Sequence, residues 1–444
     1  MWAWAEKTQI NSKELKKKLF LAIGAKGHIA WHLAAVKGSI ETLEALWICS
    51  KEAEITTEEL LLAKSEVGYT AFYLAAVTNQ VETLKQMWAW TEEKKTNSKE
   101  LKNNLFLGTD DDGYTAWHLA ALQGNLETLE TLWILCKEVE IKTDILLLAQ
   151  TGKGYTAFQL AAVKYHVVTL KKMWGWAEET QINPKELKKK LFLTKENYGK
   201  IAWHLAAVEG NIDTLEALWI CSKEVEINTE ELLLAETGRG YTAFQLAAER
   251  NQIETLKKMW VRAEETQINT TELKKNLLLA TDDDGYTVWH GVAGKGNLET
   301  LEVLWCWAKE VELNTDELLL AESEGGYTAF HLAAETNQVE TLKKMWVWAE
   351  ETQINTKEWK KMLLLATDDD GNTAWHLAAE NGTLEALETL WLLSKEAEIN
   401  TEELLLTQTG DGYTALQLAE EEGHAETLNK LRVWAEEKQT NPKS

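Results

Sequence analysis

The sequence predicts an all-α protein in which short helical repeats stack into a solenoid. Two observations support this prediction: one motif recurs ten times at fixed intervals, and apolar residues at helical spacing follow it. The chain has 444 residues, of which 45% are hydrophobic and 26% charged, a composition typical of folded proteins. Because a repeat array buries its core between neighbouring repeats, we expect one solenoid over residues 1–444 instead of two or three compact domains.

The repeated motif reads Gly-x-Thr-Ala, then Trp or Phe, then x-Leu-Ala-Ala, with departures in individual copies. Its glycines are Gly27, Gly68, Gly113, Gly154, Gly199, Gly240, Gly285, Gly326, Gly371 and Gly412. The intervals alternate between 41 and 45 residues, so the unit is an 86-residue double repeat that occurs about five times. We name the halves type A, whose motif contains Trp-His, and type B, whose motif contains Phe in most copies.

The double repeat divides into helices by its residue pattern. Residues 116–121 form a short apolar helix that follows the turn signal at Gly113 and is broken at Gly124. Apolar residues then recur at helical spacing over 126–136, which predicts a longer amphipathic second helix.

A third short helix is predicted in each repeat. In the type B copy that starts at Asn183, this residue suits the N-cap, Pro184 the first helical position and Glu186 a capping box. The third helices of type B are basic, as in Lys188–Lys190, whereas those of type A are acidic, as in Glu230 and Glu231. Stacking would therefore place opposite charges side by side, which gives a physical reason for a unit of two repeats.

The segment Asp-Asp-Gly-Tyr-Thr-Ala-Trp-His-Leu-Ala-Ala, residues 111–121, resembles the hallmark of ankyrin repeats. The segment that follows, residues 124–129, is similar to the inter-helix turn and second helix of that family. The resemblance implies antiparallel helix pairs with a projecting hairpin between repeats. The chain departs from the family in having Ala or Val288 for the usual Pro, Trp or Phe for the usual Leu, and a period longer than the usual ~33 residues. The third helix would fill the extra length.

The ends of the array differ in character. The chain begins inside a partial repeat, where Trp2 and Trp4 would lie on an uncapped edge and could make end-to-end contacts with another copy. In the last copy Glu420 and Arg432 replace apolar residues, which we interpret as a polar C-terminal cap.

Charge and segment composition restrict the partners. The net charge is −25, from 46 Lys and Arg against 71 Asp and Glu, which disfavours nucleic acid and anionic membranes and favours a protein partner with a basic surface. We find neither a signal peptide nor an apolar run long enough to span a membrane, so a cytoplasmic location is expected.

No catalytic, metal or cofactor site is expected. The type A histidines, for example His118, recur 86 residues apart, and a solenoid would keep them separate, so we interpret them as stabilising their turns. The Asp triplets before Gly113, Gly285 and Gly371 lack the ligand spacing of a calcium loop. The four cysteines lack metal spacing and are interpreted as small buried residues. No nucleophile or phosphate-binding motif occurs, so the chain is predicted not to be an enzyme.

The position after the motif glycine supplies the candidate binding residues. It is tyrosine in seven repeats: Tyr69, Tyr114, Tyr155, Tyr241, Tyr286, Tyr327 and Tyr413. The ankyrin resemblance places this position in the hairpins that contact partners, and tyrosine is a rigid anchor enriched at binding hot spots. The alternative is that these rings pack between neighbouring hairpins.

The function expected from these features is a non-enzymatic scaffold that binds protein partners along its hairpin and concave surface. Two alternatives stay open. The chain could be a structural protein that self-assembles by end-to-end stacking, or an effector of a symbiont or parasite.

Overall fold

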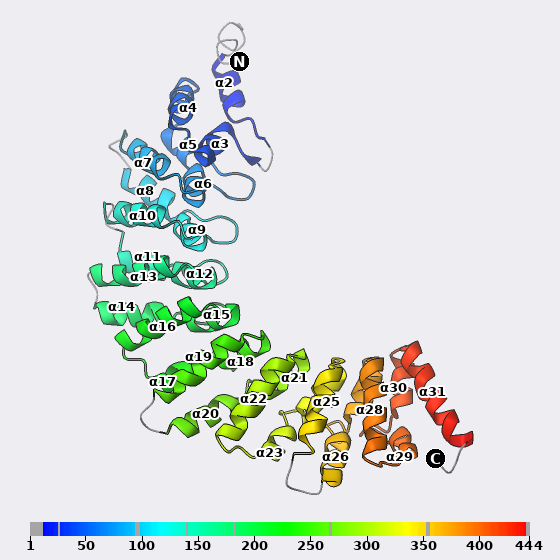
Figure 1. The fold of residues 1–444 in the computed structure, drawn as a ribbon. Helices are drawn as coiled ribbons and strands as arrows, with labels where there is room; N and C mark the ends of the chain where they lie inside the picture. Colours follow the sequence, from blue (N-terminus) through cyan, green and yellow to red (C-terminus); the bar gives the residue numbers. More distant parts are fainter. Residues whose placement is uncertain are drawn as a thin grey trace. The chain divides into compact units, whose positions relative to one another are not determined.

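The computed structural model describes residues 12–24, 27–93, 98–138, 141–180, 183–265, 269–351 and 356–440. These residues form 30 α-helices and two short 3-10 helices, and no strand occurs among them (Figure 1). Four isolated β-bridges close hairpins, for example between Gln150 and Thr156. The predicted all-α solenoid architecture of helical repeats is confirmed.

Each type A repeat contains three helices. The first helices are α3 (Ala30–Lys37), α9 (Ala116–Gln123), α15 (Ala202–Glu209), α21 (Val288–Lys295) and α27 (Ala374–Glu380). The second helices are α4 (Ile40–Glu52), α10 (Leu126–Glu138), α16 (Ile212–Glu224), α22 (Leu298–Glu310) and α28 (Leu384–Glu396). The third helices are α5 (Thr57–Leu61), α11 (Thr143–Leu148), α17 (Thr229–Leu233), α23 (Thr315–Leu319) and α29 (Thr401–Leu406).

Type B repeats have the same order with a longer third helix. The first helices are α6 (Ala71–Val77), α12 (Ala157–Val163), α18 (Ala243–Glu249), α24 (Ala329–Glu335) and α30 (Ala415–Glu421). The second helices are α7 (Val81–Trp90), α13 (Val167–Trp176), α19 (Ile253–Glu264), α25 (Val339–Trp348) and α31 (Ala425–Thr440), and the 3-10 helices η2 (Thr91–Glu93) and η3 (Ala177–Glu179) extend two of them. The third helices are α2 (Ser12–Phe20), α8 (Ser98–Leu107), α14 (Pro184–Leu193), α20 (Thr270–Leu279) and α26 (Thr356–Leu365).

Local sequence explains where these helices begin and end. The first helix α9 starts after Thr115, whose hydroxyl accepts the backbone N–H of His118, and ends at Gly124, which has a φ of 71°. The third helix α14 begins at Pro184 as predicted, with Asn183 accepting the N–H of Lys185. The predicted capping box is not observed at this helix, and Glu186 pairs instead with Lys190 across 2.9 Å.

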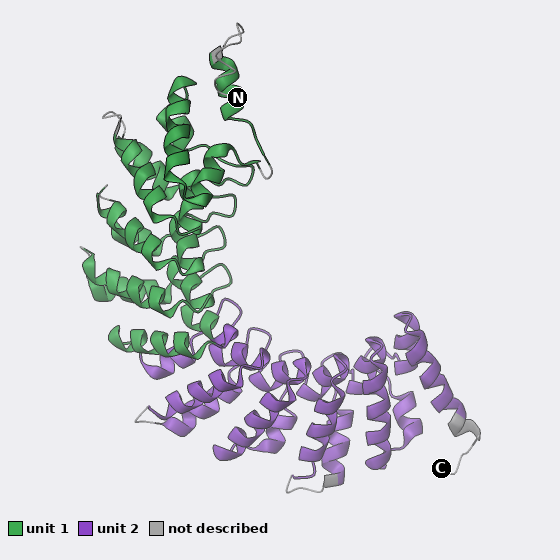
Figure 2. Ribbon diagram, turned by 45° about the horizontal axis from the view of Figure 1, so that its top comes forward, with its two compact units in different colours: residues 1–206, 211–227 green, residues 207–210, 228–444 purple. Residues whose placement is uncertain are grey.

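The chain divides into two compact units (Figure 2). Unit 1 comprises residues 1–206 and 211–227, and unit 2 comprises residues 207–210 and 228–444. In each unit the first helices of consecutive repeats pack on one another, and nine of the ten bury one large aromatic ring. The fully buried rings include Trp31, Trp117, Trp203, Trp289 and Trp375 in type A and Phe72, Phe158, Phe244 and Phe330 in type B.

In three type B repeats two tryptophans stand two positions apart in the second helix, and both are buried: Trp88 and Trp90, Trp174 and Trp176, and Trp346 and Trp348. Trp174 and Trp176 are 5% and 3% exposed. Trp174 packs on Phe158 of its own first helix and on Phe192 of the third helix. Trp176 stacks on Trp133 of the preceding repeat, with ring centroids 5.0 Å apart. Consecutive repeats are therefore locked together by aromatic packing.

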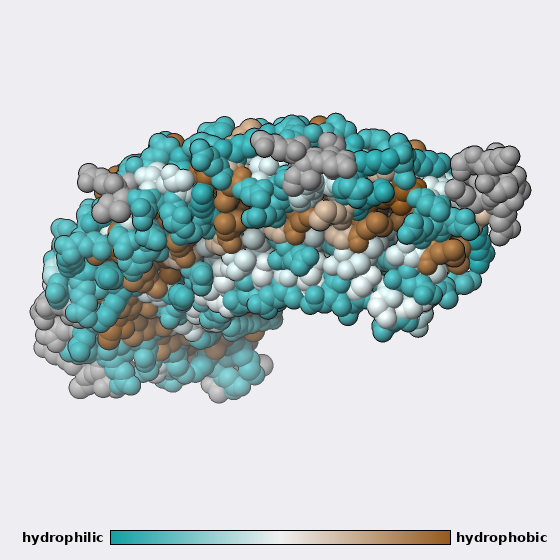
Figure 3. Space-filling model, turned by 90° about the horizontal axis from the view of Figure 1, so that it is seen from below, coloured by the Kyte–Doolittle hydropathy of each residue, from teal (hydrophilic) through white to brown (hydrophobic). Residues whose placement is uncertain are grey.

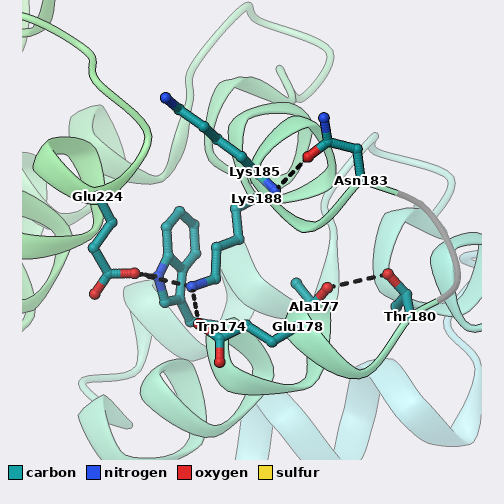
Figure 4. Close-up of polar contacts among 8 residues, drawn as sticks. All are labelled: Trp174, Ala177, Glu178, Thr180, Asn183, Lys185, Lys188 and Glu224. Carbon is teal, nitrogen blue, oxygen red and sulfur yellow. Dashed lines mark hydrogen bonds and ion pairs between the residues drawn. The ribbon is translucent and has the colours of Figure 1, made fainter.

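Ion pairs join basic helices of type B repeats to acidic residues at the repeat interfaces. Lys188 on the type B helix α14 is buried and pairs with Glu178 of its own repeat (2.6 Å) and Glu224 of the next (2.9 Å), and its ammonium lies over Trp174 (Figure 4). The same arrangement recurs at Lys274 and Lys360, 86 and 172 residues further on. The basic third helices pair mainly with the ends of the acidic second helices. Lys17 also reaches Glu59 on a third helix (3.5 Å).

Polar residues cover most of the face shown in Figure 3, and hydrophobic residues appear there as separate patches. None of the helices in the described ranges is long and apolar enough to cross a membrane. In the last helix pair, Glu420 and Arg432 form an ion pair of 3.0 Å, so the two polar replacements neutralise each other.

Candidate functional site: the hairpin tyrosines

Each hairpin is fixed by its glycine and by one side chain. The ten motif glycines have φ between 72° and 84°, a region that strongly favours glycine. In a type A hairpin, Asp110 Oδ1 accepts the N–H groups of Asp112 (3.1 Å) and Tyr114 (2.8 Å). In a type B hairpin, Thr151 Oγ1 accepts the N–H of Tyr155 (3.1 Å). The first Asp of each triplet therefore shapes the turn and holds the backbone of the residue after the glycine, which is Tyr114, Tyr286 or Asn372.

Backbone hydrogen bonds join neighbouring hairpins within each unit. In unit 1 the N–H of Gly152 donates to the carbonyl oxygen of Asp112 (2.9 Å), and that of Asn197 donates to Lys153 (3.1 Å). In unit 2 the same kind of bond runs from Asp283 to Arg239 (3.1 Å), Glu324 to Asp284 (3.1 Å), Asp369 to Gly325 (3.1 Å) and Gly410 to Asp370 (2.7 Å). A Cβ at Gly113 would lie 2.4 Å from the nitrogen of Gly152, so glycine is also needed for this close approach. The hairpins form a rigid row that can present side chains at fixed spacing.

The predicted tyrosines lie on these rows and differ in how exposed their side chains are. Tyr69, Tyr114 and Tyr155 in unit 1 and Tyr241, Tyr286 and Tyr327 in unit 2 are half-buried, whereas Tyr413 is 41% exposed. The type A ring of Tyr114 meets His118 edge-on, and that of Tyr286 meets His290 in the same way. Each half-buried ring thus packs within the hairpin row and also presents an accessible edge.

Carboxylates of the following hairpin lie beside the type B tyrosines. Burial is the largest cause that raises the pKa of Tyr327 to about 12, and the charges of Asp368, Glu335 and further neighbours contribute to the same shift. Burial and Glu196 raise the pKa of Tyr155. The hydroxyls are therefore protonated donors at neutral pH, next to negative charge.

The hairpin histidines stabilise the turns. His118 is fully buried; its Nδ1 accepts the backbone N–H of Thr115 (3.2 Å), and its Nε2 lies 2.9 Å from the carbonyl oxygen of Ala149. Burial lowers the pKa of His118, so the ring is neutral at pH 7. His290 and His376 make the same contacts in unit 2.

Sequence reasoning missed several residues of this surface. Tyr198 is 63% exposed in the fifth hairpin, where tyrosine precedes the glycine and Lys200 takes the usual position. In unit 2, Glu249, Glu335 and Glu380 stand nine residues after their motif glycines, a position that carries Val or Leu in unit 1. Burial and like charges, Glu380 first among them, raise the pKa of Glu335. A comparison of the repeats at this position would have revealed the change from apolar to acidic.

Other predicted features have different outcomes. In the ranges that the structure describes, no group of His, Cys, Asp and Glu could hold a metal ion. Cys136 and Cys221 are buried as expected, but Cys49 is half-buried and Cys306 is exposed, so the prediction of four buried thiols is wrong for these two. Trp2 and Trp4 lie outside the described residues.

Stacked helix pairs with hairpins between them define a helical repeat protein of the solenoid class. A family model for ankyrin repeats, spanning three copies, matches residues 31–145. Residues 31–145 are therefore similar to ankyrin repeats, in agreement with the resemblance of the motif. Ankyrin repeats are modules of protein–protein interaction. No curated protein matches this sequence.

Proposed function

We propose that the chain is a scaffold that binds protein partners through the hairpin tyrosines, and that the partner surface is basic. The observation that supports this proposal is the combination of half-buried tyrosines and aspartates along the hairpin row of unit 2. Tyr241, Tyr286 and Tyr327 alternate there with Asp282–Asp284 and Asp368–Asp370.

Charge complementarity favours a cationic partner over a neutral one. Burial and like-charge repulsion raise the pKa of Glu335, and a nearby Lys or Arg would relieve that repulsion. The rigid hairpin row lowers the entropic cost of presenting the tyrosines, because the backbone is already ordered before the partner binds.

The test is to capture a partner from the source cells, purify it and titrate it against variants. The triple variant Tyr155→Ala, Tyr241→Ala and Tyr327→Ala should weaken binding at least about hundredfold, since hot-spot truncations cost about 2 kcal/mol or more each. The control is Val261→Ala with Val347→Ala on exposed second-helix positions, which should leave binding unchanged.

Thermal unfolding of each variant separates binding from stability. A large fall in the unfolding midpoint of the tyrosine variant, with unchanged affinity per folded molecule, would mean that the rings only pack between hairpins. Affinity that is independent of salt concentration would contradict the basic partner surface.

A further inference from the structure

The fourth repeat departs from the other type B repeats where its first helix passes into its second. Its residues 164–168 read Lys-Tyr-His-Val-Val, whereas residues 78–82 of the second repeat read Thr-Asn-Gln-Val-Glu. The other type B repeats have Asn or Gly in place of Tyr165 and Glu in place of Val168. One aromatic and one aliphatic residue thus replace two small or polar ones in a single repeat.

This replacement is costly for the fold. Tyr165 has a φ of 65°, a left-handed conformation that Asn and Gly adopt much more readily than an aromatic residue. In the second repeat, Thr128 Oγ1 donates to Asn79 Oδ1 across 2.8 Å. The equivalent hydroxyl of Thr214 is buried without a hydrogen-bond partner. A residue that strains its backbone and leaves a hydroxyl unpaired points to a role outside folding.

Tyr165 and Val168 line a groove of about 620 Å³ that is bordered by the second helices α13 and α16 of unit 1 and by the start of α10 at Leu126. Three of its apolar side chains are well exposed: Tyr165 at 47%, Val168 at 66% and Ile220 at 54%. Lys171 stands on the α13 side of the groove, and Asp213 and Glu216 stand on the α16 side.

We propose that this groove binds an amphipathic helical segment of a protein partner. Consecutive second helices packed side by side leave a groove along their length, which suits a helix whose apolar residues recur every three or four positions. The opposite charges on its two sides favour a segment with acidic residues facing Lys171 and Lys or Arg facing Asp213. The groove lies at the end of α12 away from the hairpin, so it is separate from the hairpin tyrosines and goes beyond the function proposed for them.

The experiment uses a displayed library of random 16-residue peptides, selected on the full chain and counter-selected on the variant Tyr165→Asn with Val168→Glu. These substitutions give the fourth repeat the residues of the second, sixth and eighth, so the variant should fold at least as well as the parent. Enriched peptides should carry apolar residues three or four positions apart, with Lys or Arg along one edge. In fluorescence anisotropy they should bind the variant at least tenfold more weakly, and Tyr155→Ala should not affect them.

A variant that places the same two residues in the second repeat provides an independent test. Asn79→Tyr with Glu82→Val places the same pair beside Ile134, which is 58% exposed, and should create binding for the same peptides in the Tyr165→Asn, Val168→Glu background. The proposal is overturned if no peptide distinguishes the parent from the variant. A second result would also overturn it: if sedimentation shows that the parent dimerises and the Tyr165→Asn, Val168→Glu variant does not, the groove binds a second copy of the chain.

Discussion

Lys188 Nζ lies 2.9 Å from Glu224 Oε2 in the following repeat, and Trp174 Nε1 donates to the same carboxylate oxygen across 2.6 Å. Because the Lys188 side chain is only 8% exposed and lies over Trp174, Lys188→Ala would remove an ion-pair partner of Glu224 and uncover the tryptophan. We expect the free energy of unfolding to fall by about 1–2 kcal/mol, measured by chemical denaturation. The control is Lys190→Ala, whose side chain is 60% exposed and which should change stability by less than about 0.5 kcal/mol.

The pH dependence of this variant follows from the same contacts. Burial opposes the shift, but the hydrogen bonds from Trp174 and Lys188 lower the pKa of Glu224 below 4.5. A lowered folded-state pKa contributes stability above the unfolded value that is lost as the pH falls. The penalty of Lys188→Ala should therefore shrink between pH 5 and pH 3, and an equal penalty at both would contradict the pairing.

The charge of Glu335 has the opposite effect on stability from the charge of Glu224. Its raised pKa means that the folded state favours the protonated form, so its penalty is present at neutral pH and disappears as the pH falls through the folded pKa. Glu335→Gln should raise the free energy of unfolding by about 0.5 kcal/mol at pH 7 and by nothing at pH 4. Denaturation at both pH values measures this, with Glu324→Gln in the neighbouring hairpin as control. A gain that persists at pH 4 would show that packing and not charge is responsible.

The order of the double repeats can be predicted from the sequence because the residues that begin and end the helices act locally. Gly113 tolerates a positive φ and Pro184 suits the first position of a helix, and both preferences act locally. The packing of Trp176 is not readable in this way, since its main partner, Trp133, belongs to the preceding repeat. Helical spacing shows which residues share a face but not which neighbour covers that face.

The candidate site is predictable to a similar extent. The tyrosine positions follow from the motif, but Tyr198 escapes because it stands before the glycine. The groove beside Tyr165 depends on the approach of α13 to α16 and on the backbone conformation of one residue. Departures from the internal consensus, such as Val168, are the sequence signal that points to it.

Aromatic stacking between repeats should dominate stability. Trp348 is 3% exposed and stacks on Trp305 of the preceding repeat, with ring centroids 4.6 Å apart. Trp348→Ala should cost about 3–5 kcal/mol because it leaves a cavity at a repeat interface. Val347→Ala, at a residue that is 49% exposed, is the matched control and should be nearly neutral. Similar denaturation curves for the two variants would contradict the interface packing.

Replacing Tyr165 with asparagine should increase the stability of the fold. Tyr165→Asn relieves the left-handed backbone and supplies a partner for the Thr214 hydroxyl, so we expect a gain of about 1 kcal/mol in thermal unfolding. The reverse change, Asn79→Tyr, should lose a similar amount. If Tyr165→Asn destabilises the chain, the tyrosine contributes to folding and its cost has been overestimated.

Amide hydrogen exchange of the chain, with and without its captured partner, tests the central claim most directly. The account predicts that the partner protects hairpins 151–155, 237–241 and 323–327 and leaves the second helix 339–348 unchanged. Protection confined to second helices, with none in the hairpins, would contradict binding through the hairpin tyrosines.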